Sequence, residues 1–248
     1  MIAQLRAELL KQRSTRTGLG LLLGLIALVV LAMLLHGLSL PPSTLASHDH
    51  QLTVLGRGEL LGSLFAGLLG AVSITAEYRH GTIRPTFLAM PRRGRVLAAK
   101  VSASMLIGAS FGVTACGLAA LIGTAALRAR GIGVQLDAGD VGLLVGGGGA
   151  AAALWAALGT GVGALVRNQV PALVGICAWL LFVESLLVGD VAGVTKIGRF
   201  GPGAAAAAIT GQEPATLLSP PVGILLLVTY ASAAALAGTF AAARRDVG

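Results

Sequence analysis

The chain has 248 residues, of which 55% are hydrophobic and 11% are charged, with a formal net charge of +8. A soluble domain has about 25% charged residues, so this composition excludes an ordinary soluble protein. The apolar runs are continuous rather than alternating, which excludes a membrane β-barrel and predicts an all-α integral membrane protein.

Six apolar runs are each long enough to cross a hydrocarbon core as a helix, which takes about 20 residues. We therefore predict six transmembrane helices in a single domain over residues 1–248. The first run is longer than the about 7–15 apolar residues of a signal peptide, so we expect it to be retained. The predicted spans are residues 19–38, 58–76, 101–127, 141–166, 170–188 and 222–243.

The N-terminal segment 1–16 places Ile2, Leu5 and Leu9 on one helical face and Arg6 and Arg13 on others. This pattern is typical of an amphipathic interfacial helix on the inner membrane surface. It fits a charged anchor that only sets topology equally well.

The loop after the first predicted span contains His48, Asp49 and His50. A closed metal site takes about four ligands in fixed geometry, and this loop offers too few. We therefore predict no metal site.

Small residues recur at every fourth position in several predicted spans, and such faces let helix backbones approach closely in lipid. The pattern predicts a compact bundle or a dimer. The run 146–153, GGGGAAAA, is too rich in glycine to form a stiff helix alone. The predicted packing positions are Gly58, Gly62, Gly70, Gly108, Gly112, Gly159 and Gly163.

Ionisable groups inside the predicted spans are few and lie near their outer ends. Glu184 is expected to reach water or to meet Lys196 or Arg199, and Glu59 and His36 are expected to be structural or interfacial. No HExxH, GxSxG or closely paired carboxylates occur, so we predict no catalytic residue and no enzyme activity.

Before the last predicted span, the segment 202–209, PGAAAAAI, is apolar but too short to cross a bilayer. It is predicted to be a re-entrant or half-inserted segment.

The basic residues predict the orientation of the chain. With a cytoplasmic N-terminus, the inner segments hold 13 of the 18 Lys and Arg residues and the outer segments hold 5. This split obeys the positive-inside rule and places both termini in the cytoplasm. It also accounts for the net charge without a nucleic-acid partner, and it predicts a multi-pass protein of the cytoplasmic membrane.

The largest predicted cytoplasmic segment is residues 76–100, AEYRHGTIRPTFLAMPRRGRVLAAK, which carries seven charged residues, six of them basic. Gly81 can supply a sharp turn, Thr82 can cap a helix after it, and Pro91 would end that helix. Arginine suits carboxylates or lipid phosphates, and Glu77 could pair with one of the arginines. As an alternative, the arginines only set topology and bind anionic headgroups.

This segment closely resembles the loop after the second span in type-two ABC exporter permeases, where E-x-x-x-G-T is followed by P-x-x-R and a lysine. In that family the loop forms a coupling helix that fits a cleft on an ATP-binding cassette subunit. The chain is richer in Ala and Gly than the family and has few aromatic residues, which puts a large aromatic substrate in doubt. The residues that the resemblance assigns to coupling are Glu77, Tyr78, Arg79, Gly81, Thr82, Pro91, Arg92, Arg93, Arg95 and Lys100.

The resemblance implies the membrane subunit of an ABC exporter. No G-x-x-x-x-G-K-[ST] motif is present, so the chain itself is expected to bind no cofactor. ATP and Mg²⁺ would be bound by separate cassette ATPase subunits, and a second permease copy or a paralogue would complete the assembly in the lipid bilayer. A non-transporting membrane anchor or immunity-type subunit and an ion-coupled secondary transporter are the alternatives.

Overall fold

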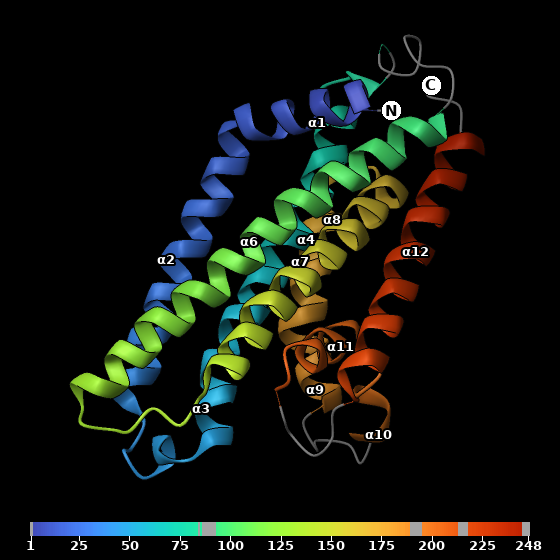
Figure 1. The fold of residues 1–248 in the computed structure, drawn as a ribbon. Coiled ribbons are helices and arrows are strands. Elements are labelled where there is room, and N and C mark those ends of the chain that lie inside the picture. Colours follow the sequence, from blue (N-terminus) through green and yellow to red (C-terminus); the bar gives the residue numbers. More distant parts are fainter. Residues whose placement is uncertain (1, 84, 86–92, 189–194, 213–217, 245–248) are drawn as a thin grey trace.

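A computed structural model describes residues 2–83, 85, 93–188, 195–212 and 218–244, and all regular structure among them is helical. Figure 1 shows a bundle of long helices with a short helix across one end. The helices are α1 (Ile2–Ser14), α2 (Arg16–Ser39), α3 (His48–Leu55), α4 (Arg57–Arg79), α6 (Arg93–Ala129), α7 (Ala138–Val166), α8 (Gln169–Ala178), α9 (Glu184–Val188), α10 (Thr195–Gly198), α11 (Pro202–Ile209) and α12 (Pro220–Arg244). A 3-10 turn η1 (Thr44–Ala46) precedes α3, and a π-helical turn η2 (Trp179–Val183) joins α8 to α9.

Within these residues, five helical segments are long and apolar enough to cross a membrane, as expected for a multi-pass membrane protein. The predicted span 170–188 is not among these five segments, because its apolar helix, Gln169–Val183, is shorter than they are. That helix ends where the acidic Glu184 opens α9, although α8, η2 and α9 follow one another without a break. The five segments are Arg16–Gly37, His48–Arg79, Gly94–Ala129, Ala138–Val166 and Pro220–Ala241.

The segments rich in basic residues gather at one end of the bundle. Helix α1, the end of α4, the start of α6, the turn between α7 and α8, and the last turn of α12 all lie at that end (Figure 1). Helix α3, the link between α6 and α7, and α10 lie at the opposite end. We call these the α1 end and the α3 end.

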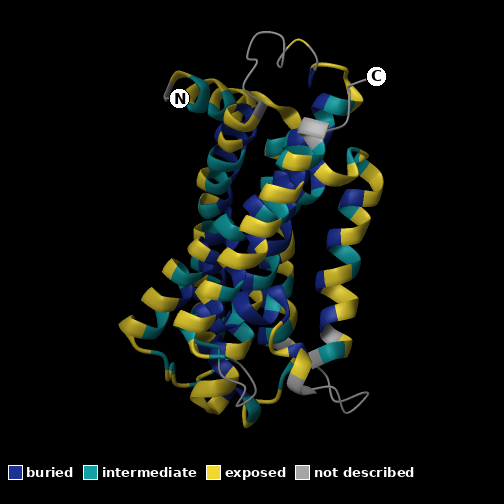
Figure 2. Cartoon of the chain, turned by 90° about the vertical axis from the view of Figure 1, so that its right-hand side faces the viewer, coloured by how far each residue is buried: buried dark blue, intermediate teal, exposed yellow. Residues whose placement is uncertain are grey.

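Helix α4 lies at the centre of the bundle and packs against both α6 and α7. In its most apolar stretch, 67% of residues are buried, against 17% in α2 and in α12. Figure 2 shows buried residues concentrated in the interior and exposed ones on the outer helices. The exposed side chains of α2 and α12 are largely leucine and other apolar residues, as expected of surfaces in contact with lipid.

Each of the seven predicted packing glycines lies against a neighbouring helix. A Cβ added at any of them would come within 3.1 Å of an atom on another helix. At Gly70 it would overlap the Ala156 carbonyl, and at Gly159 it would overlap the Gly67 carbonyl, so α4 and α7 touch backbone to backbone. Side chains larger than hydrogen are therefore excluded at these two positions.

Helix α7 runs without a break through the glycine run that begins at Gly146. Glycine is about 1 kcal/mol less favourable than alanine in a helix interior, so this segment needs support from its neighbours. A Cβ at Gly147 would lie 2.6 Å from the Ile209 carbonyl of α11, and one at Gly148 would overlap the Cys116 sulfur of α6. Packing between α6 and α11 thus keeps the run helical.

We predict that Gly159→Leu lowers the midpoint of thermal unfolding by several degrees in detergent, because the side chain would push α7 away from α4. Overpacking of this kind costs about 1–3 kcal/mol. Gly146→Leu on the same helix is the matched control, since an added Cβ there meets no atom within 4 Å. Equal midpoints for the two variants, measured by fluorescence-detected size exclusion after heating, would contradict the close approach of α4 and α7.

Candidate functional site

The described start of the segment between α4 and α6, residues 80–83, lies at the α1 end. Helix α4 ends at Arg79, where the His80 amide donates to the Ala76 carbonyl at 2.9 Å. Gly81 follows with a φ of +67°, in the left-handed region that residues with a Cβ rarely adopt. The chain therefore turns sharply away from α4 at the position where the sequence predicted a turn.

Lys100 is the buried centre of a cluster of charged residues near the end of α4. Its side chain is 1% exposed, although a lysine is almost never fully buried without a partner. Its Nζ donates to Glu8 Oε2 at 2.7 Å, to Glu77 Oε1 at 3.1 Å and to the Ser73 carbonyl at 3.3 Å. One ammonium group thus joins α1, α4 and the beginning of α6.

Glu77 also forms an ion pair with Lys11 of α1. Two carboxylates and two ammonium groups therefore meet in the cluster of Glu8, Lys11, Glu77 and Lys100, which we call the charge cluster. Its formal charges cancel, and its two buried members, Glu77 and Lys100, are paired with each other, which is the condition under which ionised groups are tolerated away from water. The sequence predicted an arginine partner for Glu77, whereas the partners among the described side chains are the two lysines.

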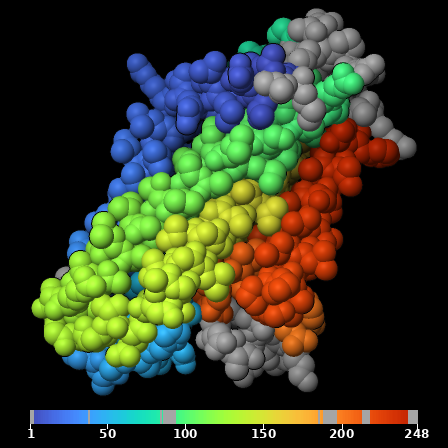
Figure 3. Space-filling model, in the orientation of Figure 1, coloured from blue at the N-terminus to red at the C-terminus, as the bar shows by residue number. Residues whose placement is uncertain are grey.

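A second chain of polar contacts runs beside the charge cluster. Gln12 Nε2 of α1 donates to Ser104 Oγ of α6 at 3.1 Å, and that hydroxyl donates to Ser73 Oγ of α4 at 3.2 Å. Glu77 Oε2 and Gln12 Oε1 are buried and have no hydrogen-bond partner among the described residues. On the surface of the molecule, α1 lies against α6 (Figure 3).

A cavity of about 310 Å³ opens onto the charge cluster. Glu8, Lys11 and Glu77 line it together with His80 and Thr82, the residues at which the chain leaves α4. The charge cluster is therefore adjacent to the residues at which the chain leaves α4.

The end of α4 is also connected to the other side of the bundle. The Arg167 guanidinium lies 5.4 Å from the centre of the Tyr78 ring, a cation–π distance, and Arg79 approaches Gln169 Oε1 at 3.5 Å. Arg167 ends α7 in a left-handed conformation and donates to the Ala241 carbonyl of α12 at 2.7 Å. The second predicted span thus ends in contact with the turn between α7 and α8.

The remaining predicted coupling residues lie at the edges of this site or outside the part that the structure describes. Thr82 and Arg95 are exposed. Arg93 begins α6, and its side chain falls outside the described part of the chain. Pro91, Arg92 and most of the predicted coupling helix also lie outside the described residues.

Sequence reasoning did not single out Glu8, Lys11 or Ser73 as part of the site. Glu8 and Lys11 are three residues apart, so they share one face of a helix. That spacing was a usable signal for a polar face on α1. It could not indicate that this face meets Glu77 and Lys100.

Two carboxylates are buried near the α3 end, where the sequence predicted outer helix ends. Glu59 Oε1 accepts from Ser63 Oγ at 2.7 Å. Glu184 does not reach water as predicted; it is buried and accepts from the Ala204 amide at 2.6 Å, near the start of α11. Arg199 instead lies over the Phe200 ring.

Helix α11 carries the segment that was predicted to be half-inserted. It is eight residues long, mostly buried, and it packs against α12, α7 and α4. His36 Nδ1 lies 2.8 Å from the Ala32 carbonyl of its own helix.

At the α3 end, His48 Nε2 lies 3.0 Å from Asp140 Oδ2. Across the described parts of the chain, no three His, Cys, Asp or Glu side chains form a group that could hold a metal ion. The two cysteines, Cys116 and Cys177, are free thiols in α6 and α8.

Comparison of the sequence with protein-family models gives no match, and comparison with curated proteins gives none either.

We predict that Lys100→Met destabilises the protein strongly, because it leaves Glu8 and Glu77 facing each other with one cation fewer. Breaking a buried ion pair by removing one partner costs about 3–5 kcal/mol. Arg95→Met, an exposed position on the same helix, is the matched control and should change the thermal midpoint little. A Lys100→Met midpoint equal to that of Arg95→Met would show that the charge cluster does not support the fold.

Proposed function

We propose that the chain is the membrane permease subunit of an ABC exporter, which couples ATP hydrolysis by a separate cassette ATPase to export across the cytoplasmic membrane. The observation that carries this proposal is the charge cluster. Through Lys100 and Glu77 it joins the two helices from which the predicted coupling segment emerges, and through Glu8 and Lys11 it joins both to α1.

A coupling device must pass a force from the cytoplasm to the helices in the membrane. A partner that pulls or pushes the segment 80–92 acts on the end of α4 and the start of α6 at once, because Glu77 and Lys100 hold these ends together. Both helices pack closely against α7 at the centre of the bundle. Displacement of the segment would therefore move the bundle core rather than bend a loop.

The proposal includes finer features of the assembly. The chain would cross the membrane six times, with α8, η2 and α9 as the shortened fifth span, α1 on the cytoplasmic surface and α11 half-inserted from outside. A second permease copy or a paralogue would pack on one of the apolar outer faces. ATP and Mg²⁺ would be held by the cassette ATPases.

A second candidate function, ion-coupled secondary transport, is favoured by one observation. Glu59 and Glu184 are both buried near the α3 end, and buried carboxylates inside membrane proteins commonly carry protons or cations. In that function the activity would respond to a proton gradient without ATP, and it would be lost in Glu184→Gln. If transport needs only ATP and the Glu184→Gln variant is still active, the exporter is favoured.

The proposed function predicts that gentle detergent extraction from the native membrane recovers the chain with a Mg²⁺-dependent ATPase that carries a Walker A motif. The sharpest variant has residues 82–92 shuffled in order, which keeps composition and charge but removes the arrangement of residues. We expect the co-purified ATPase to fall at least tenfold with the shuffled segment, while the chain remains monodisperse.

One outcome would contradict the exporter, and another would contradict specific docking by residues 82–92. If no ATPase co-purifies, the chain functions without one, as an anchor or an ion-coupled transporter would. If the shuffled chain retains its full amount of ATPase, the segment acts through charge alone and is not a specific docking element.

A further inference from the structure

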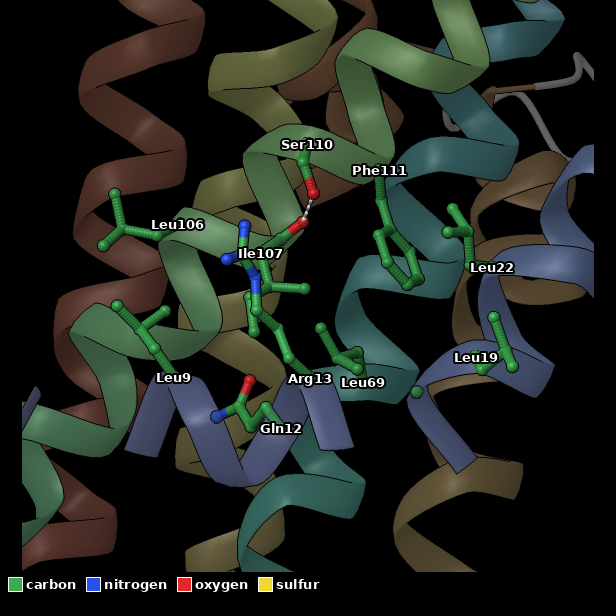
Figure 4. A pocket seen from close by; sticks show the side chains of 11 residues that line it. Leu9, Gln12, Arg13, Leu19, Leu22, Leu69, Leu106, Ile107, Ser110 and Phe111 are labelled. Atoms are coloured by element: carbon green, nitrogen blue, oxygen red, sulfur yellow. Dashed lines mark hydrogen bonds between the residues drawn. The ribbon is translucent and has the colours of Figure 1, made fainter. Parts of the chain in front are cut away.

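A second groove lies next to the cavity that opens onto the charge cluster, shares Gln12 and Leu69 with it, and is lined mostly by apolar side chains (Figure 4). It has a volume of about 470 Å³, within the roughly 300–1,000 Å³ of pockets that hold small ligands. Helices α1, α2, α4 and α6 all contribute to its walls. Its apolar lining is Leu9, Leu19, Leu22, Leu69, Leu106, Ile107 and Phe111.

The groove is open toward the region that lipid occupies. Leu19 at the start of α2 and Leu106 on α6 stand at its edges and are both exposed. Further along α2, Leu23 and Leu28 are exposed as well. An apolar groove continuous with such a surface is accessible to acyl chains from the inner leaflet.

Two polar side chains of α1 interrupt this apolar lining. Arg13 extends from α1 along the groove (Figure 4), and it forms no ion pair with any described residue. Gln12 is 8% exposed, and its Oε1 is the buried oxygen that lacks a hydrogen-bond partner. Arg13 is exposed, so its guanidinium can meet an anion at the mouth of the groove, and the buried Gln12 oxygen beside it lacks a donor.

We propose that this groove binds an anionic phospholipid of the inner leaflet. The phosphate pairs with the Arg13 guanidinium, whose planar donors match phosphate oxygens. A headgroup hydroxyl donates to Gln12 Oε1, and one acyl chain lies along Leu19, Leu22 and Phe111. The bound lipid would brace α1, the helix that carries Glu8 and Lys11 into the charge cluster.

The charge of Arg13 selects the occupant. A cationic amphiphile would place a like charge beside the guanidinium, and an uncharged ligand would leave it unpaired. A phosphodiester lipid with a hydroxylated headgroup satisfies both Arg13 and Gln12. The inference depends on the chain lying in a membrane with its α1 end toward the inner leaflet, and it stands whether or not the chain is an exporter.

The test uses phosphatidylglycerol with a photoreactive acyl chain, added to the full chain in nanodiscs, and phosphatidylcholine with the same chain as the reference. Adducts are mapped by mass spectrometry of peptides. We expect phosphatidylglycerol adducts on residues 19–22 and 106–111, at about five times the yield of phosphatidylcholine. That ratio corresponds to about 1 kcal/mol, the contribution of one basic side chain at an anionic lipid surface.

Variants assign the effect to the groove. Arg13→Gln should reduce the phosphatidylglycerol yield at these peptides about fivefold, and Arg13→Lys should retain most of it. Arg6→Gln removes the same charge from the same helix outside the groove and should stay within twofold of the unmodified chain.

Equal yields for the two lipids, or an Arg13→Gln yield equal to that of Arg6→Gln, would overturn the proposal. So would phosphatidylglycerol adducts confined to other helices. Arg13→Lys with the full yield restored would support a charge-selective site and would show that the protein remains folded when position 13 is changed.

Discussion

The burial of the Lys100 ammonium is the constraint on which the α1 end of this protein depends. An ammonium group out of water must be paired, and here its partners come from two different helices, Glu8 on α1 and Glu77 on α4. The position of α1 is not set by helical preference alone. It is set by the need to bring Glu8 and Lys11 to the ends of α4 and α6.

At the centre of the bundle, close packing of helix backbones holds the helices together. Lipid gives helices no hydrophobic reason to associate, so α4, α6 and α7 gain stability from close backbone contact at glycines such as Gly70 and Gly159. Helices packed this closely move together. Ion pairing at the α1 end and glycine packing in the core thus make one mechanical unit, while α2 and α12 remain on its outside with their apolar faces toward lipid.

The sequence predicted the helical class, most of the long apolar helices and the position of the sharp turn at Gly81, because these follow from local composition. It did not predict the partners of Glu77 and Lys100, since Lys11 and Glu8 are 66 and 92 residues away in the chain. The burial of Glu184 was not predicted for the same reason. Its acceptor role depends on α11, a neighbour in space that no spacing along the sequence reveals.

The proposed function requires that the charge cluster transmits force between residues 80–92 and the core of the bundle. The most direct test is the ATPase turnover of the purified complex with the cassette ATPase, compared between the unmodified chain and Glu77→Gln at equal amounts of bound ATPase. If the permease alters the turnover of the bound ATPase through this cluster, Glu77→Gln should return the turnover to that of the isolated ATPase. Unchanged turnover with equal binding would contradict the account.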